Sequence, residues 1–243
     1  MVLDVIDLRA FYASHLGEIV RRLIGQRLLR RWPSVAGDVL LGVGYATPYL
    51  EDLARGAERV LAFMPAAQGV VNWPHQGPNR AALVLDDALP LPDASIDRAL
   101  VIHSLEVAAR PRDHLHEIWR VLAAGGRMIL VVPNRAGIWA RTEATPFGHG
   151  QPYGSGQLTG LLREAQFSPL GWSEALAVPP FRRGPWLSTG ANWERVGRTL
   201  WPAFAGVIIV EATKQFYQGV TAREVSRRFK PALRPALIPP AGA

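Results

Sequence analysis

The segment from residue 38 to residue 46, DVLLGVGYA, constrains the fold more than any other part of this chain. An apolar run ends at two glycines, Gly42 and Gly44, and a predicted helix at 47–55 follows them. This pattern predicts a buried strand that turns through the glycines into a helix, with backbone amides presented at the turn. It is typical of the first β-α-β unit of a nucleotide-binding α/β protein, although such glycines can also serve only the close packing of strand on helix.

The second strand of such a unit usually ends in an acidic residue. An Asp or Glu about 20 residues beyond the glycines binds the ribose hydroxyls of the nucleotide. Here the predicted strand at 59–63 is followed by Met64 and Pro65. The sequence therefore predicts the frame of a nucleotide site without its usual ribose ligand.

Predicted strands and helices alternate along the chain. After a leading amphipathic helix at 8–32, strands are predicted at 38–42, 59–63, 81–85, 97–102 and 126–132, and helices at 47–55, 65–71 and 112–123. The second half adds a loop at 137–156, a helix at 156–166, a strand at 169–177, a helix at 191–203 and a strand at 206–216. This alternation predicts a parallel sheet with right-handed crossovers, helices on both faces and ligands at the carboxyl ends of the strands.

Composition excludes several classes of protein. The chain has no cysteine, which excludes disulfides, thiolate metal sites and a cysteine nucleophile. No apolar run reaches the roughly 18 residues of a membrane-spanning helix, and the first ten residues carry Asp4 and Asp7 where a secretion signal has basic residues. The six histidines are scattered, so no metal site is predicted. We therefore expect a soluble, cytoplasmic protein without a membrane span.

The net charge of +7 is concentrated at the two ends of the chain. Residues 1–34 hold six arginines and three acidic residues, and residues 213–243 hold six basic residues and one acidic residue. Clustered arginines can bind a polyanion by replacing its counterions. Only two of the 27 basic residues are lysines, however, which indicates a general preference for arginine in this sequence. A solvated basic surface is the favoured interpretation, and a nucleic-acid partner is not favoured.

Four further segments resemble the class I S-adenosylmethionine-dependent methyltransferases. They are the stretch 87–97 (DALPLPDASID), the run 114–134 (HLHEIWRVLAAGGRMILVVPN), the predicted helix from Gln157 to Phe167 and the predicted strand from Gly206 to Gln215. The segments occur in the order and spacing of that family, from about Asp38 to Gln218. The resemblance implies a Rossmann-like, mostly parallel seven-stranded sheet with helices on both faces and an antiparallel last strand. It divides the chain into an N-terminal helical extension (1–36), a methyltransferase-like domain (37–217) and a basic, proline-rich tail (218–243).

The resemblance also implies S-adenosylmethionine as the cofactor, bound over the glycine turn. The residues of this turn that match the family's motif are Gly42, Gly44, Tyr45 and Ala46. Two acidic residues of the family pattern are missing, because Leu40 replaces the one in the first strand and Met64 replaces the ribose-binding one. Loss of a charged acceptor costs about 1.5–3 kcal/mol, or about one to two decades of affinity. Weak cofactor binding is therefore expected.

Other residues could contribute to the cofactor site. Gln68 lies one helical turn beyond Met64 and could supply a neutral substitute for the missing acid. Asp86 or Asp87, after the third predicted strand, matches the place where the family contacts the adenine amino group. Either aspartate could equally serve as a turn or cap residue. His103, which follows the fourth predicted strand, is a further candidate cofactor residue.

Family substrates enter over the ends of the fourth and fifth strands, where His103 stands. Imidazole titrates near neutrality, so His103 could take a proton from the acceptor; alternatively it only hydrogen-bonds a neighbouring loop. The loop at 145–153 is stiffened by prolines and carries His149 and Tyr153, which we expect to face the substrate. The alternative is a lid that packs Phe147 and Tyr153 into the body and leaves His149 in water.

The sequence thus predicts a methyltransferase that positions an unknown small-molecule or macromolecular nucleophile. The alternative, motivated by Leu40 and Met64, is a methyltransferase-like protein without catalytic activity that acts as a binding or regulatory partner. A third hypothesis is a nucleic-acid or acidic-membrane binder that uses the basic ends. Fold similarity alone does not choose among these. An open crevice above the glycines would favour the enzyme, whereas side chains such as Tyr45, Phe63 and Met64 filling it would not.

Overall fold

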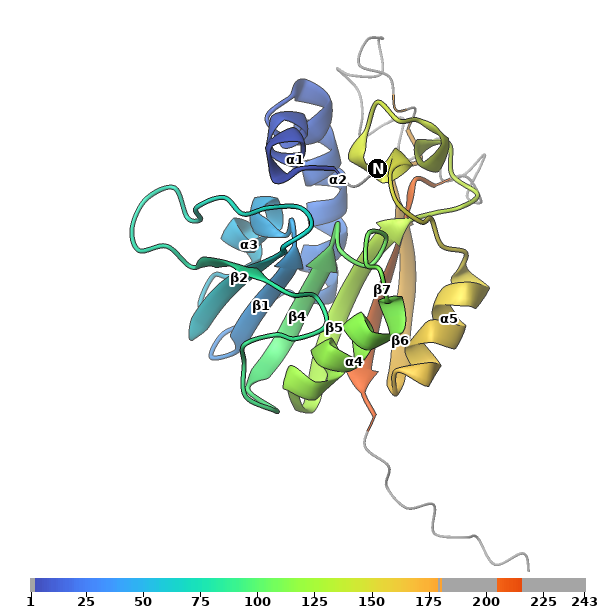
Figure 1. The fold of residues 1–243 in the computed structure, drawn as a ribbon. Helices are drawn as coiled ribbons and strands as arrows, with labels where there is room; N and C mark the ends of the chain where they lie inside the picture. Colours follow the sequence, from blue (N-terminus) through green and yellow to red (C-terminus); the bar gives the residue numbers. More distant parts are fainter. Residues whose placement is uncertain (1–2, 179, 181–204, 216–243) are drawn as a thin grey trace, which may run out of the picture.

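The computed structural model describes residues 3–178, 180 and 205–215. Its centre is a seven-stranded sheet of order β3-β2-β1-β4-β5-β7-β6 (Figure 1). The strands are β1 (Val39–Gly44), β2 (Arg59–Pro65), β3 (Ala81–Val84), β4 (Ile96–Ile102), β5 (Leu122–Pro133), β6 (Phe167–Ala175) and β7 (Val207–Lys214). The described helices are α1 (Val5–Tyr12), α2 (His15–Arg31), α3 (Thr47–Leu53), α4 (Pro111–Val121) and α5 (Ser155–Glu164), with short 3-10 turns η1 (Trp139–Arg141) and η2 (Pro146–Gly148).

The sheet is parallel except at its last strand. β1 to β5 pair with one another in parallel, and β7 pairs antiparallel with both β5 and β6. The Rossmann-like, mostly parallel seven-stranded sheet with an antiparallel last strand is thereby confirmed.

Helices cover both faces of the sheet because its central strands are apolar on both faces. On one face, α1, α2 and α3 form a core cluster with strand residues such as Leu40, Leu100 and Ile129. On the other face, α4 and α5 form a second cluster with the alternate strand residues, such as Leu41 and Val101. Successive residues of a strand point to opposite faces, so the two cores share the same strands.

β1 and β4 are neighbours in the sheet, and the chain adds strands outward from them in opposite directions. The chain runs outward from β1 to β2 and β3 and then returns to β4 on the other side of β1. Such a switch point leaves a ligand-binding place outside the carboxyl ends of the strands. Gly44, at the end of β1, pairs with Ile102, at the end of β4. The glycine turn and His103, which follows Ile102, therefore lie side by side at the switch point.

The leading helix is interrupted, so the prediction of one helix at 8–32 is wrong. α1 ends at Tyr12 and α2 begins at His15. Ser14 caps α2: its hydroxyl accepts from the amide of Gly17 at 3.1 Å and donates to the carbonyl of Phe11 at 2.6 Å. The apolar periodicity runs through this cap, which is why the sequence pattern did not reveal it. The break turns α1 over the carboxyl ends of the strands (Figure 1).

Several other predicted segments can be compared with the structure. Residues 65–71 do not form the predicted short helix: Pro65 ends β2, and residues 66–68 form a turn in which the backbone amide of Gln68 donates to the carbonyl of Pro65. The predicted helix at 191–203 and the tail at 218–243 lie outside the described residues. The division into segments 1–36, 37–217 and 218–243 stays a prediction. Among the described helices, none is long and apolar enough to cross a membrane.

We expect Ser14→Ala to lower the free energy of unfolding by about 1 kcal/mol, because the first turn of α2 loses its capping hydroxyl. Urea unfolding of the full chain measures this change. Ser14→Thr retains a hydroxyl at the same place and should stay within about 0.5 kcal/mol of the parent. Equal losses in the two variants would show that the hydroxyl does not cap the helix.

Candidate functional site

The glycine turn at the end of β1 is packed tightly by the chain itself. Gly44 has a φ of +82°, which residues with a Cβ rarely adopt. A Cβ at Gly44 would lie 2.2 Å from the carbonyl oxygen of Ile102. A Cβ at Gly42 would lie 2.7 Å from Cδ1 of Leu50. Both glycines are therefore needed for the close approach of β1 to β4 and α3.

His103 is buried at the carboxyl end of β4, beside Gly44. Its side chain and backbone are only 2% exposed, and its φ of +54° is uncommon for a residue other than glycine. Such a conformation persists only where the surroundings hold it. The Nε2 amide of Gln68 donates to the His103 carbonyl at 2.8 Å. On the ring, Nε2 lies 2.9 Å from the hydroxyl of Tyr12, and Nδ1 lies 3.3 Å from Oε1 of Glu106.

The Glu106 carboxylate determines the direction of these contacts. A carboxylate accepts protons, so it favours the tautomer of His103 in which Nδ1 carries the proton and Nε2 presents a lone pair. The Tyr12 hydroxyl therefore donates to Nε2, and it can accept from the hydroxyl of Tyr49 at 3.0 Å. The resulting chain of polar contacts ties α3, α1 and the end of β4 together.

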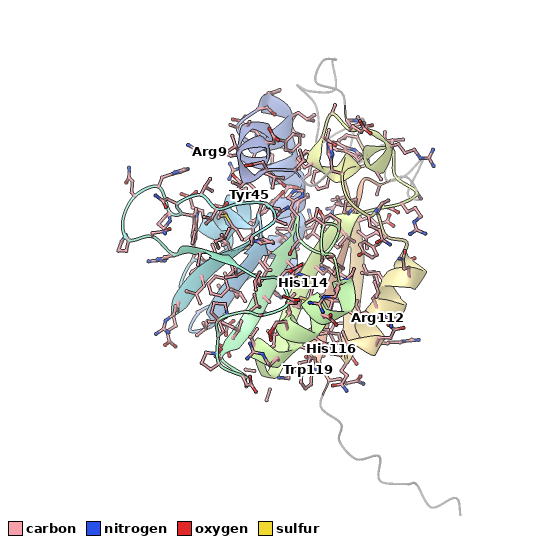
Figure 2. All side chains as sticks on the ribbon, viewed as in Figure 1. Arg9, Tyr45, Arg112, His114, His116 and Trp119 are labelled. Atoms are coloured by element: carbon pink, nitrogen blue, oxygen red, sulfur yellow. The ribbon has the colours of Figure 1, made fainter. Side chains whose placement is uncertain are left out.

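Aromatic rings surround this chain of contacts. The centroid of the Tyr12 ring lies 5.7 Å from that of Tyr45 and 5.8 Å from that of Tyr49, and the His103 ring lies 4.9 Å from that of Phe147. In Figure 2, Tyr45 lies between α1 and the carboxyl ends of the strands. Burial raises the pKa of the Tyr12 and Tyr49 hydroxyls above their ordinary value. Both hydroxyls are therefore neutral near pH 7 and can donate.

With α1 in this position, the switch point is filled by the chain's own side chains. Tyr12, Tyr45, Gln68 and His103 are each at most 8% exposed. The residues at the turn thus face neighbouring side chains, and the space beside Gly42 and Gly44 is taken by atoms of Leu50 and Ile102. In the described conformation these four side chains therefore leave little surface that a cofactor could contact.

The remaining predicted cofactor residues have other partners. Met64 and Ala46 are 1% exposed and belong to the apolar cluster that includes α1 and α2. The carbonyl of Asp86 accepts from a histidine of α4, and the carboxylate of Asp87 forms an ion pair with Arg110. The structure thus brings together Gly44, Gln68 and His103 of the predicted set. The cofactor roles of all these residues stay predictions.

A second buried histidine ties the loop after β3 to the end of β4. Nδ1 of His114 donates to the Asp86 carbonyl at 2.8 Å, which leaves Nε2 to accept from the Ser104 hydroxyl at 3.0 Å. Burial lowers the pKa of His114, so its imidazole is neutral near pH 7. His114 therefore fixes the Asp86 loop against the residue that follows His103.

The loop at 145–153 contacts His103 through Phe147. Tyr153 is fully buried, and its hydroxyl donates to the carbonyl of Leu105 at 3.2 Å, while burial raises the pKa of that hydroxyl to about 12. Nε2 of His149 lies 2.8 Å from the carbonyl oxygen of Glu143, and the ring lines a surface pocket of about 410 Å³ beside α1. Tyr153 lines another pocket, of about 370 Å³, at the start of α4. The substrate-facing roles of His149 and Tyr153 stay predictions.

Sequence reasoning missed Tyr12, Tyr49, Glu106 and His114. Glu106 stands three residues after His103, a spacing that could have suggested the pair. Tyr12 and Tyr49 carry no local signal, because they reach His103 only through the packing of α1 and α3 on the sheet. His114 lies within the predicted helix at 112–123, but its partners Asp86 and Ser104 lie 28 and 10 residues away along the chain and belong to other segments.

We expect His114→Gln to flatten the pH dependence of stability below pH 7. Because His114 stays neutral in the folded protein, the unfolded chain binds a proton more readily once the pH is below about 6.5. In the parent, the free energy of unfolding therefore falls between about pH 6.5 and the lower folded-state pKa, by up to about 1.4 kcal/mol per pH unit. Urea unfolding at pH 7, 6 and 5 measures the slope that His114→Gln loses.

The control for this experiment is His116→Gln, which changes an exposed histidine of the same helix. It should keep the slope of the parent. A parental slope in His114→Gln would mean that His114 is not held neutral.

Residues 38–130 match the family model described as the methyltransferase domain. The matched region begins at β1 and ends within β5, so it includes the glycine turn and both buried histidines. No curated protein sequence matches the chain.

Several solved structures share the fold over most of the chain. A S-adenosylmethionine-dependent methyltransferase from Thermotoga maritima is 16% identical, with a TM-score of 0.57 over 87% of this chain and 96% of that one. A chain of the Haloferax volcanii complex between the Trm112 methyltransferase activator and a protein described as a methyltransferase is 19% identical, with a TM-score of 0.63 over 89% and 100%. The cyclase SpnF is 21% identical, with a TM-score of 0.53 over 80% of each chain.

At these identities the structural likeness shows the fold, and SpnF shows that the fold also carries a protein named for another reaction. The matched domain is described as a methyltransferase domain, and several of the neighbours are described as S-adenosylmethionine-dependent. Residues 38–130 thus match a methyltransferase domain, and the chain shares its fold with solved structures described as S-adenosylmethionine-dependent methyltransferases.

Proposed function

We propose that this chain is a methyltransferase that uses S-adenosylmethionine and binds its acceptor over His103. The observation that carries the proposal is the meeting of the glycine turn with His103 at the switch point between β1 and β4. Ligands of open α/β sheets bind at this place. The domain match over 38–130 supports the class of reaction.

The proposal requires α1 to leave the switch point. α1 is a helix of eight residues, separated from α2 by the Ser14 cap, so it can move without unwinding α2. Polar contacts that hold it in place are those of the Tyr12 hydroxyl with His103 and with the hydroxyl of Tyr49, and that of the Val5 amide with the carbonyl of Gln68 at 2.8 Å. Movement of an element that covers a site is a common step in enzymes, because it admits ligands and then excludes water.

His103 is the group that this chain can direct at an acceptor. The lone pair of Nε2 faces the space that Tyr12 fills, and Glu106 beside Nδ1 orients the ring. His103 could therefore hold or take the acceptor's proton. Positioning of the acceptor supplies the rest of the rate enhancement that the protein can give.

Calorimetry with S-adenosylhomocysteine and the full chain tests the proposal. We expect weak, saturable binding at millimolar ligand, accompanied by a thermal shift. We also expect Met64→Asp to tighten binding about tenfold, because it restores a charged acceptor for the ribose hydroxyls. Leu85→Asp adds the same charge at a side chain that is 60% exposed beyond β3, and it should leave the affinity unchanged.

The measurement on the parent decides the question even where Met64→Asp does not fold. Absence of both heat and thermal shift at millimolar S-adenosylhomocysteine would count against a methyltransferase. Equal tightening by Leu85→Asp would show that added charge, and not a ribose ligand, causes the change.

A second candidate is a methyltransferase-like protein that binds or regulates a partner without catalysis. The filled switch point favours it, together with Leu40 and Met64 at the places of the family's acids. The structurally similar Haloferax volcanii chain comes from a complex with an activator, so a protein partner has a precedent on this fold. This candidate predicts a stable complex and no binding of S-adenosylhomocysteine. A monomer that consumes S-adenosylmethionine would rule it out.

A further inference from the structure

We infer that the acceptor is a phenol or a similar hydroxylated aromatic compound, and that Tyr12 occupies the acceptor's place in the described conformation. The inference rests on the proposed function and names the substrate class of the same site. We call the space that the Tyr12 side chain fills the Tyr12 slot; it is bounded by Tyr45, Tyr49 and His103.

The shape of the Tyr12 slot suits one aromatic ring. The Tyr45 ring is tilted by 32° to that of Tyr12, whereas the Tyr49 and His103 rings meet it at 87° and 69°. The three centroid distances lie between 5.7 and 5.8 Å, within the range of favourable aromatic pairs. An occupant is therefore packed on one side and meets two other rings in edge-to-face pairs. Planar aromatic compounds can use all three contacts.

The polar end of the slot suits a hydroxyl group. Nε2 of His103 offers a lone pair at 2.9 Å, and the hydroxyl of Tyr49 stands 3.0 Å away. A group bound there must donate to Nε2 and can accept from Tyr49 at the same time, which a single hydroxyl oxygen does. An apolar occupant would leave both partners buried and unsatisfied, which is costly.

His103 is held in place by contacts that do not involve α1. Gln68 bonds its carbonyl, Glu106 faces Nδ1, and the Phe147 ring packs on the imidazole. Withdrawal of α1 would therefore leave the lone pair of Nε2 directed into an aromatic-walled space. Because this space lies at the end of β4, a hydroxyl bound to His103 would lie at the switch point where the cofactor is expected.

The experiment uses p-cresol, which has the same structure as the side chain of tyrosine, and toluene, which lacks the hydroxyl. Tyr12→Ala vacates the slot in the full chain, and Phe11→Ala is the matched control. Phe11 precedes Tyr12 in α1, is also buried, and packs its ring on Phe147 and Tyr12. Both ligands are titrated without S-adenosylmethionine, and the proton resonances of the His103 ring are followed by NMR.

We expect p-cresol to bind Tyr12→Ala saturably. The affinity for p-cresol divided by that for toluene should be about tenfold higher in Tyr12→Ala than in Phe11→Ala, because p-cresol forms a hydrogen bond to the His103–Glu106 pair. At saturation, p-cresol should shift the His103 resonances more than toluene does, because only p-cresol donates a hydrogen bond to Nε2. Tyr12→Phe keeps the ring in the slot and should bind neither ligand. Equal ratios in Tyr12→Ala and Phe11→Ala would mean that the slot is only a cavity and would overturn the inference.

A second measurement covers the case in which Tyr12→Ala does not fold. In the unmodified chain, p-cresol that competes with Tyr12 should speed the hydrogen exchange of the Val5 amide, which bonds to Gln68. Toluene at the same concentration should not. An unchanged exchange rate with both ligands would overturn the inference.

The outcome is independent of the test of the proposed function. Binding of S-adenosylhomocysteine without preference for p-cresol would leave a methyltransferase whose acceptor is not a phenol. Preference for p-cresol without binding of S-adenosylhomocysteine would leave a phenol-binding slot and remove methyl transfer.

Discussion

The contact between the Tyr12 hydroxyl and Nε2 of His103 determines how the N-terminal helix and the sheet fit together. The contact is buried, and it joins the last residue of α1 to the end of β4. Glu106, beside Nδ1 of the same ring, favours the tautomer in which Nε2 accepts from Tyr12. Because His103 follows the strand that borders the switch point, the same contact also determines whether the place for a ligand is open or filled. The position of α1 therefore determines whether the switch point is filled by Tyr12.

Local patterns in the sequence predicted the sheet because they report directly on burial and turns. The apolar strands, the glycines after β1 and the order of the later segments were sufficient for a seven-stranded sheet with an antiparallel last strand. Two helix predictions were wrong: a capping side chain interrupts one predicted helix, and a backbone turn replaces the other. The Ser14 hydroxyl caps α2 and ends the preceding helix, and the turn closed by the Gln68 amide replaces a helix after β2.

The site was less predictable because its contacts join residues that are far apart in sequence. Gly44, Gln68 and His103 were identified as candidates, and they do meet. The side-chain amide of Gln68, however, donates to the backbone carbonyl of His103. No rule of sequence spacing indicates this partner. Tyr12 lies 91 residues from His103 along the chain, so only the path of α1 over the sheet reveals the pair.

The exchange of acids for apolar residues and the closed position of α1 are physically linked. Leu40 and Met64 lie in the same apolar cluster as Val5, Leu8 and Phe11 of α1, and each of the two is at most 1% exposed. A carboxylate at residue 64 would be desolvated beneath α1, and without a ribose hydroxyl or a cation it would destabilise that packing. The thioether of Met64 avoids this cost when no nucleotide is bound. Met64 would thus both weaken the binding of the cofactor and stabilise the packing of α1, because a carboxylate at residue 64 would have the opposite effect on each.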